Sequence, residues 1–192
     1  MLAEYKMTLP SLCLKSAPPR GRAVLEEAQA QIGFIPNMYA NMVHSPGLLE
    51  TYLAGYARFR AESGFTPAEQ EVVFLTISRD NGCEYCVGAH SMLADTQSKL
   101  AREVTDAIRD GKPVPDPKLA VLSGFTSRML ATRGLPRAED VSVFLQAGYT
   151  EQQVLEIILA IAVKTLSNYT NHLFHTTLDP MFTARKWEDP RG

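Results

Sequence analysis

Apolar and polar residues follow a helical period along most of this 192-residue chain. Between residues 48 and 61, apolar side chains stand at positions 48, 49, 52, 53, 56 and 59, which is close to the spacing of one helix face. No segment alternates with a period of two for long enough to predict a strand. The pattern predicts an all-α fold with helices over residues 23–32, 38–43, 48–61, 66–80, 83–107, 118–132, 138–146 and 150–174.

Two of these helices begin with the same local signal. Thr66 is followed by Pro67 and then by Glu69, which is the pattern of a capping box with proline at the first helical position. Thr150 and Gln153 repeat the capping-box spacing further along the chain. Both positions are therefore predicted to be helix N-termini.

The two capped segments also share a spacing of polar residues, which indicates a degenerate internal repeat. Adding 85 to the numbers of Glu71, Cys83, Cys86 and His90 gives Glu156, Asn168, Asn171 and His175. We predict an N-terminal arm over residues 1–20 and a single helical domain over 21–192, with two similar two-helix units at about 64–107 and 148–178. The two asparagines and the histidine of the second unit are interpreted as structural.

Composition and charge exclude several classes of protein. Apolar residues make up 45% and charged residues 21% of the chain, as in ordinary globular domains. The net charge of −2 argues against a nucleic-acid or membrane-surface binder, which needs a basic footprint. The longest apolar run, 157–163, is far shorter than a membrane span, and no signal peptide is evident. With only three cysteines, the expected setting is a reducing cytoplasm.

The candidate chemistry lies in the segment NGCEYCVGAH, with Glu71 upstream. Asn81 and Gly82 are a turn pair, so Cys83 and Cys86 are expected in the first turn of the next helix. Unpaired backbone N–H groups and the helix dipole at that place favour a thiolate, which is the nucleophilic form of cysteine. The spacing also allows the two sulfurs to form a reversible disulfide.

His90 and Glu71 complete a predicted proton relay. His90 follows Cys86 by one helical turn, so we expect it to hydrogen-bond the thiol and accept its proton. Glu71 is flanked by apolar residues, so we expect it to be half-buried, to orient His90 and to have a raised pKa. In this interpretation Cys83 is the resolving thiol.

Other interpretations of these residues are open. A structural zinc site needs four ligands, whereas only Cys83, Cys86 and His90 cluster here, with Cys13 as the sole spare cysteine. A thioredoxin-type motif needs a strand–helix context that the pattern does not predict. Glu71 taken alone would be a solvated residue near a helix start. Outside the motif, Cys13 is interpreted as incidental, Trp187 in the tail as a surface or partner contact, and His44 as a helix-end residue without a role.

Together these motifs make the chain similar to a known family. E-x11-C-x2-C-x3-H, filled by Glu71, Cys83, Cys86 and His90, resembles the signature of the AhpD-like alkylhydroperoxidases of the carboxymuconolactone decarboxylase superfamily. GFIPNMYANMVHSPGLLETY and AGYTEQQVLEIILAIAVKTLSNYTNH, followed by LDP, resemble its longer peroxidase-related branch, so that the resemblance covers most of residues 30–182.

The resemblance implies an all-helical homo-oligomer, a trimer or a multiple of it, that reduces hydroperoxides. It implies that Cys86 attacks the peroxide, that Cys83 condenses with the resulting sulfenic acid, and that a dithiol donor, either lipoyl-type or a thioredoxin-like protein, resets the site. No haem or flavin is implied, and no metal-binding residue is predicted. One departure is that some relatives have a histidine between the cysteines, where this chain has Glu84 and Tyr85.

The sequence thus favours a thiol peroxidase among four hypotheses. A disulfide reductase of a non-peroxide substrate would use the same cysteine pair. A decarboxylase is disfavoured, because proton transfer needs no second cysteine. A non-enzymatic redox-sensing oligomer would use the disulfide to change its assembly.

Overall fold

The computed structural model describes residues 2–191, and every regular element in this range is a helix. The prediction of an all-α fold is therefore confirmed. No helix within these residues has the length and apolar character needed to cross a membrane. The elements, in chain order, are α1 (Pro19–Ile32), α2 (Asn37–Met42), α3 (Pro46–Glu62), α4 (Pro67–Asp80), α5 (Glu84–Thr96), α6 (Arg102–Asp110), α7 (Pro117–Ala131), α8 (Ala138–Gln146), α9 (Glu151–Phe174) and the 3₁₀ helix η1 (Pro180–Arg185).

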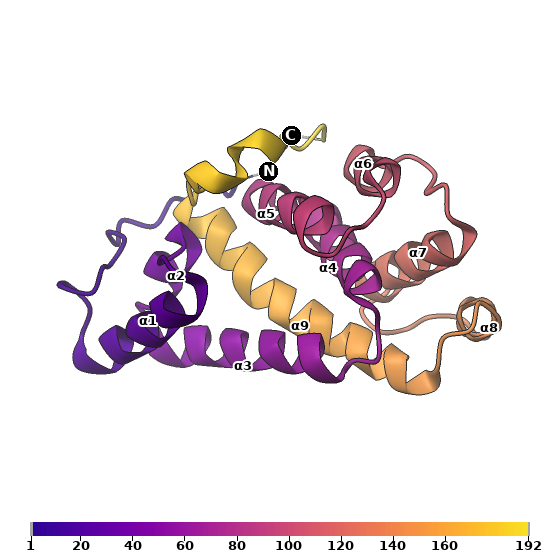
Figure 1. The fold of residues 1–192 in the computed structure, drawn as a ribbon, viewed down its shortest axis with the longest axis horizontal. Coiled ribbons are helices and arrows are strands. Elements are labelled where there is room, and N and C mark those ends of the chain that lie inside the picture. The colour runs from indigo at the N-terminus through magenta and orange to yellow at the C-terminus, as the bar shows by residue number, and fades with distance from the viewer. Residues whose placement is uncertain (1, 192) are drawn as a thin grey trace.

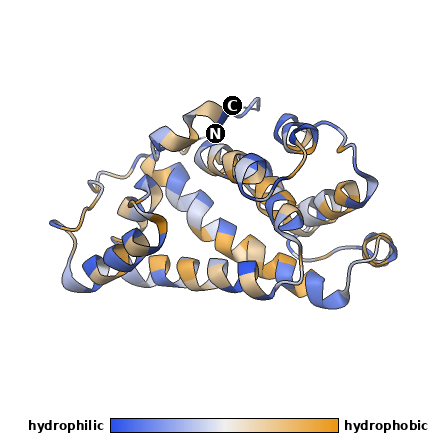
Figure 2. Cartoon of the chain, viewed as in Figure 1, coloured by the Kyte–Doolittle hydropathy of each residue, from blue (hydrophilic) through white to orange (hydrophobic). Residues whose placement is uncertain are grey.

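The helices pack around α4 and α9. The 24-residue α9 crosses the molecule diagonally, with α3 on one side and α4 and α5 on the other (Figure 1). α4 contacts α5, α6, α7 and α9, and its residues 69–78 are all buried. Five of these ten buried residues are polar, so α4 needs hydrogen-bond partners for them as well as cover for its apolar side chains. Several helices around it have both hydrophobic and hydrophilic positions, as Figure 2 shows, and so can face the core on one side and solvent on the other.

Local sequence signals account for the start of both central helices. The Thr66 side chain accepts from the backbone N–H of Glu69, and the Glu69 side chain accepts from the backbone N–H of Thr66. Thr150 and Gln153 make the same pair of hydrogen bonds at the start of α9. Both predicted capping boxes are therefore confirmed.

The break between α4 and α5 also follows the sequence. Gly82 has a φ of 71°, a left-handed conformation that glycine adopts without steric cost. The backbone N–H of Cys83 bonds to the carbonyl of Ser78 at 2.9 Å and closes α4. Cys83 then becomes the N-cap residue of α5, which places Cys86 in the first turn of that helix.

The prediction of one continuous helix over 83–107 is wrong, because this segment forms two helices, α5 and α6, with a turn between them. The N–H groups of Ser98 and Leu100 bond to the carbonyls of Leu93 and Ala94 and close α5. Lys99 adopts a φ of 53° in this turn, although the segment contains neither glycine nor proline. η1 is a further element that the pattern did not predict.

The segment that corresponds to the second repeat unit is one unbroken helix. The first unit breaks at Gly82, between α4 and α5, whereas α9 continues past the equivalent position. α9 ends at His175, which has a φ of 51°. The capping boxes and spacing agree between the two halves, but the second half lacks the helix break. The duplication and the proposed unit boundaries stay predictions.

Both ends of the described chain lie against the helices. The arm before α1 is irregular, and the N–H of Met7 bonds to the carbonyl of Leu173 at the end of α9. Trp187 was predicted to be a surface or partner contact, and this is wrong. Its ring is buried, and its Nε1–H donates to the carbonyl of Arg109 at 3.1 Å, so the tail packs on α6.

Candidate functional site

The two motif cysteines lie together in the interior at the start of α5. Cys83 is 1% exposed and Cys86 is 2% exposed, and both are free thiols. Cys13 is exposed on the N-terminal arm. The candidate site therefore contains the two buried thiols, and Cys13 is not part of it.

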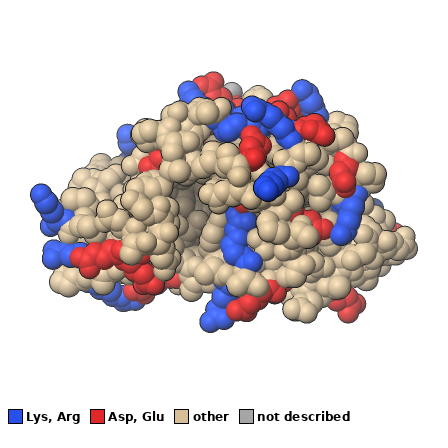
Figure 3. Space-filling model, viewed as in Figure 1, with Lys and Arg blue, Asp and Glu red and all other residues tan. Residues whose placement is uncertain are grey.

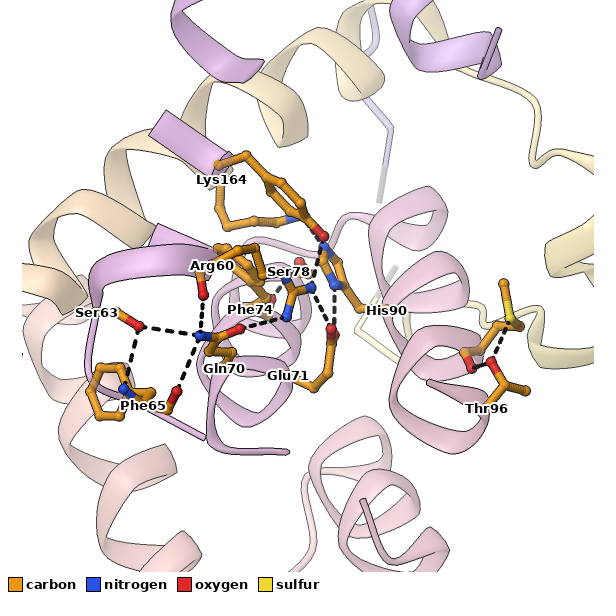
Figure 4. Close-up of polar contacts among 12 residues, drawn as sticks. Arg60, Ser63, Phe65, Gln70, Glu71, Phe74, Ser78, His90, Thr96 and Lys164 are labelled. Atoms are coloured by element: carbon orange, nitrogen blue, oxygen red, sulfur yellow. Dashed lines mark hydrogen bonds and ion pairs between the residues drawn. The ribbon is translucent and has the colours of Figure 1, made fainter. Parts of the chain in front are cut away.

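Glu71 and His90 meet as the motif predicts. A Glu71 carboxylate oxygen, Oε2, lies 2.8 Å from His90 Nδ1, and both side chains are buried (Figure 4). Arg60, on α3, donates to the other carboxylate oxygen of Glu71. Arg60 also donates to the hydroxyl of Tyr56 at 2.7 Å, so the guanidinium joins α3 to this buried pair.

Lys164 is the residue that the sequence analysis missed. It is fully buried in α9, and its Nζ lies 2.9 Å from His90 Nε2 (Figure 4). Both ring nitrogens of His90 are thus engaged, and the direct His90–Cys86 hydrogen bond that we expected is not among the contacts within residues 2–191. One signal could have identified Lys164: it is the sole Lys, Arg, Asp or Glu between residues 157 and 174.

The charged neighbours of His90 determine its protonation state. Burial acts to raise the pKa of Glu71, but His90 and Arg60 outweigh it, so that the pKa is lowered and the carboxylate is charged. The expectation of a raised pKa for Glu71 is therefore wrong, because burial is outweighed by its interaction with His90 and by Arg60, which the sequence analysis did not include. Burial and the nearby Lys164 lower the pKa of His90. A neutral ring then donates Nδ1–H to Glu71 and accepts from the Lys164 ammonium at Nε2.

The two cysteines differ in their tendency to ionise. Burial acts against a thiolate at Cys86, but the hydrogen bond from Cys83 and the charge of Lys164 outweigh it, and the pKa of Cys86 lies well below its ordinary value. Burial and the neighbouring Cys86 raise the pKa of Cys83 well above its ordinary value. The pair is therefore one thiolate and one thiol, with the negative charge on Cys86.

Asn171, in the last turn of α9, also reaches the sulfurs. Its Nδ2 lies 3.3 Å from Cys86 Sγ and 3.6 Å from Cys83 Sγ. The repeat aligned Asn171 with Cys86 and we interpreted it as structural, but it contacts the candidate site directly. The other two residues of the second unit that we interpreted as structural bond elsewhere: Asn168 bonds to Asn81, and His175 bonds to the carbonyl of Ala3.

A cavity of about 410 Å³ opens at Cys86. Cys86, His90 and Lys164 form part of its wall, whereas Cys83 does not. Figure 3 shows a hollow in this region, bordered mostly by uncharged side chains. The rest of the wall is mainly apolar and aromatic, and its members are Gln31, Ile32, Phe34, Pro36, Met38, Tyr39, Tyr52, Tyr56, Tyr85, Ala89, Met92, Leu93, Gln97, Met181 and Phe182.

The tyrosines of this wall stay protonated. Burial raises the pKa of Tyr39, Tyr52, Tyr56 and Tyr85, and the charge of Cys86 adds to the effect. Phenol groups in this state can donate hydrogen bonds to a bound molecule. The cavity thus has a polar end at Cys86 and apolar walls elsewhere, as is typical of small-molecule sites.

The wall that η1 contributes is held by a buried carboxylate. Asp179 accepts from the hydroxyl of Tyr85 at 2.5 Å and from the backbone N–H of Asn37 at 3.2 Å. A side chain at Gly88, in α5, would place its Cβ 3.2 Å from Leu178 and 3.4 Å from the carbonyl of Arg185. The absence of a side chain at Gly88 therefore lets the C-terminal segment lie close against α5.

Comparison with known proteins gives the context for this site. Residues 46–120 match the model of the carboxymuconolactone decarboxylase family. A comparison with curated protein sequences found no match. A peroxidase-related protein with the alkylhydroperoxidase AhpD core, from Ralstonia eutropha JMP134, has a similar structure, with a TM-score of 0.79, 23% identity, and coverage of 94% of this chain and 96% of that one.

Two further structures have the same fold. A peroxidase-related protein from Silicibacter sp. TM1040 gives a TM-score of 0.75 at 18% identity, covering 96% of this chain and 97% of that one. A cysteine-to-alanine variant of the debrominase Bmp8, in complex with 2,3,4-tribromopyrrole, gives a TM-score of 0.73 at 17% identity, covering 95% and 97%. The chain is thus similar to the carboxymuconolactone decarboxylase family over residues 46–120, and it has the same fold as peroxidase-related proteins with the AhpD core.

Proposed function

We propose that this protein is a thiol-dependent peroxidase that reduces organic hydroperoxides with Cys86 and Cys83. One observation carries the proposal: a buried cysteine of lowered pKa faces a cavity of mainly apolar wall, and a second thiol lies beside it. The thiolate is the nucleophile in such chemistry. The resemblance of the cysteine motif to that of the AhpD-like alkylhydroperoxidases supports this activity, as does the match of residues 46–120 to the carboxymuconolactone decarboxylase family.

In the first step, the Cys86 thiolate attacks the terminal peroxide oxygen. The S–O bond forms as the O–O bond breaks, and an alkoxide leaves. Lys164, on the cavity wall, is the group placed to give this alkoxide a proton. Cys86 becomes a sulfenic acid, and the hydroperoxide leaves as an alcohol.

In the second step, the sulfur of Cys83 attacks the Cys86 sulfenic acid. The S–S bond forms, the S–O bond breaks, and water leaves with the Cys83 proton. An external dithiol then reduces the disulfide by exchange and becomes a disulfide itself. Because Cys86 is 2% exposed, a slender dithiol such as a lipoyl group fits this step better than the surface thiols of a thioredoxin-like protein. Assembly into trimers or their multiples remains part of the proposal.

Glu71, His90 and Arg60 act as positioning residues in this scheme. The Glu71 carboxylate fixes which nitrogen of His90 carries the proton, and the other nitrogen holds the Lys164 ammonium beside Cys86. Arg60 compensates the buried charge of Glu71. The relay is therefore proposed to reach the thiolate through Lys164.

The test is turnover of cumene hydroperoxide with dihydrolipoamide as the dithiol. Cys86→Ser should abolish peroxide consumption and Cys83→Ser should allow one turnover without disulfide, whereas Cys13→Ser should behave as the native chain. Equal activity of Cys86→Ser and the native chain would overturn the proposal. Failure to form a sulfenic acid at Cys86, with disulfide exchange intact, would favour the disulfide reductase.

A second candidate is reductive dehalogenation of an aromatic ring. The aromatic walls and the 410 Å³ volume of the cavity favour it, together with the fold shared with the debrominase. The Cys86 thiolate would take the halogen from carbon, the carbon would gain a proton, and Cys83 would displace halide to form the disulfide. Bromide release from 2,3,4-tribromopyrrole, measured with the same dithiol, separates this activity from peroxide reduction.

A further inference from the structure

The amide group of Asn171 lies among three sulfur atoms. Its Nδ2 is 3.3 Å from Cys86 Sγ, 3.6 Å from Cys83 Sγ and 3.3 Å from the thioether sulfur of Met38. Asn171 is 2% exposed, so water does not compete for these contacts. Because an amide nitrogen carries two hydrogens, the three sulfurs compete for two donated bonds.

The negative charge on Cys86 decides this competition. A thiolate is a stronger acceptor than a thiol or a thioether, because hydrogen bonds to charged groups are the strong ones. A thiolate also requires a donor, which is consistent with the amide orientation that places Nδ2 toward the sulfurs. Asn171 therefore adds a donated bond on Cys86 to the charge that Lys164 supplies.

The other end of the same amide is unsatisfied. Asn171 Oδ1 is buried, and no residue between 2 and 191 donates to it. A buried acceptor without a donor is unfavourable and calls for an explanation. Oxidation of Cys86 creates a suitable donor beside it, since the sulfenic acid carries an O–H group that the thiolate lacks.

We propose that Asn171 is a catalytic residue that holds Cys86 in both of its states. Nδ2 donates to the thiolate before the peroxide reacts, and Oδ1 accepts the O–H of the sulfenic acid afterwards. This bond fixes the direction of the S–O bond while Cys83 attacks, so that water leaves and the disulfide forms. The role rests on the proposed peroxidase function and extends it to the closure step.

Two variants separate the two ends of the amide. Asn171→Leu keeps the size of the side chain and removes both the donor and the acceptor, whereas Asn171→Asp keeps acceptor oxygens and loses the donor. Asn168→Ala is the matched control, because Asn168 is fully buried one turn earlier on α9 and bonds to Asn81. All variants are made in the full chain with Cys13→Ser, so that alkylation reports the buried pair.

The first readout is the pH profile of Cys86 alkylation by iodoacetamide, with the site of labelling read by mass spectrometry. Asn171→Leu and Asn171→Asp should both move the profile to higher pH, by roughly one unit or more, which lowers the alkylation rate about tenfold at pH values below the midpoint of the native profile. Asn168→Ala should keep the native profile. A structural role alone would change stability and leave the profile in place.

The second readout is a single turnover with one equivalent of cumene hydroperoxide. A dimedone-type reagent should trap more Cys86 sulfenic acid in Asn171→Leu than in the native chain, because disulfide closure is slower. Native profiles and native closure in folded Asn171 variants would overturn the inference. If Asn171→Leu does not fold, Asn171→Asp supplies the alkylation test. If peroxide produces neither sulfenic acid nor the Cys83–Cys86 disulfide in the native chain, that result would instead overturn the peroxidase function, together with the closure role that depends on it.

Discussion

Lys164 Nζ lies 2.9 Å from His90 Nε2, on the opposite side of the ring from Glu71. The lone pair on Nε2 that would take a proton from Cys86 is therefore already used by Lys164. The positive charge that most lowers the pKa of Cys86 comes from Lys164 on α9, and Lys164 is hydrogen-bonded to His90. The roles of the two residues can be tested separately.

Replacing Lys164 with methionine should slow the attack by Cys86. The change removes the charge that favours the thiolate, so the pKa of Cys86 should rise and peroxidase activity at neutral pH should fall by roughly 10²-fold. Stopped-flow peroxide consumption and the alkylation pH profile measure the effect. Lys112→Met is the control, because Lys112 is exposed and pairs with Asp110. Native activity in Lys164→Met would remove the lysine from the mechanism.

Stability should fall as the pH is lowered below neutral. The pKa of His90 is depressed in the folded chain, below about 6.5, so the unfolded state takes up a proton first. The contribution of His90 is complete above pH 6.5 and is lost as the pH falls through the folded-state pKa. Glu71, also depressed, adds a second loss below about pH 4.5.

Urea unfolding between pH 8 and pH 5 measures the first of these losses. The free energy of unfolding should decrease toward pH 5, and His90→Gln should have a shallower slope over the same range. A slope in the variant as steep as in the native chain would show that the proton is taken up elsewhere.

Tyr85→Phe should loosen the η1 wall of the cavity. The variant loses the donor that Asp179 accepts from, which should cost about 1–3 kcal/mol of unfolding free energy. The KM for a bulky hydroperoxide should rise, with little change in kcat, because the reacting groups stay in place. Tyr169→Phe, at an exposed position on α9, is the control. A fall in kcat with an unchanged KM would contradict this role for Tyr85.

Two glycines in helices should respond to alanine in opposite directions. A Cβ at Gly55 would lie 2.7 Å from a methyl group of Val163, so Gly55→Ala should force α3 away from α9 and cost about 1–3 kcal/mol. At Gly124, in α7, the Cβ meets nothing within 4 Å. Gly124→Ala should therefore stabilise the chain by roughly 0.5–1 kcal/mol. Thermal unfolding of both variants checks the pair, and equal shifts would contradict the packing argument.

The helix starts and the α4–α5 break could be predicted because their signals are local. Thr66 and Thr150 bond within their own first turns, and Gly82 supplies the conformation that ends α4. The turn after α5 was missed because Lys99 adopts its left-handed conformation without a sequence signal. The tail was misjudged because the burial of Trp187 depends on α6, which is far away in the sequence.

The candidate site was predictable only as far as one motif extends. Glu71 and His90 lie 19 residues apart within a capped helix pair, so their meeting follows from local geometry. Lys164 and Asn171 come from a helix more than 70 residues further on, and only tertiary packing of α9 brings them to the sulfurs. The direction of the Glu71 pKa was mistaken because the opposing effects of His90 and Arg60 outweigh burial, and their sizes depend on distances that the sequence does not give.

The residue at position 88 can affect the size of the cavity although it does not line the cavity. Met181 and Phe182 form part of the wall, and how closely η1 approaches α5 depends on the missing methyl group at Gly88, which is itself not in the wall. A single methyl group added there would require Leu178 and the carbonyl of Arg185 to move by a few tenths of an ångström, which would shift the part of the cavity wall that η1 contributes. Related chains could thus differ in the molecules that they bind, even where every residue that contacts the bound molecule is the same.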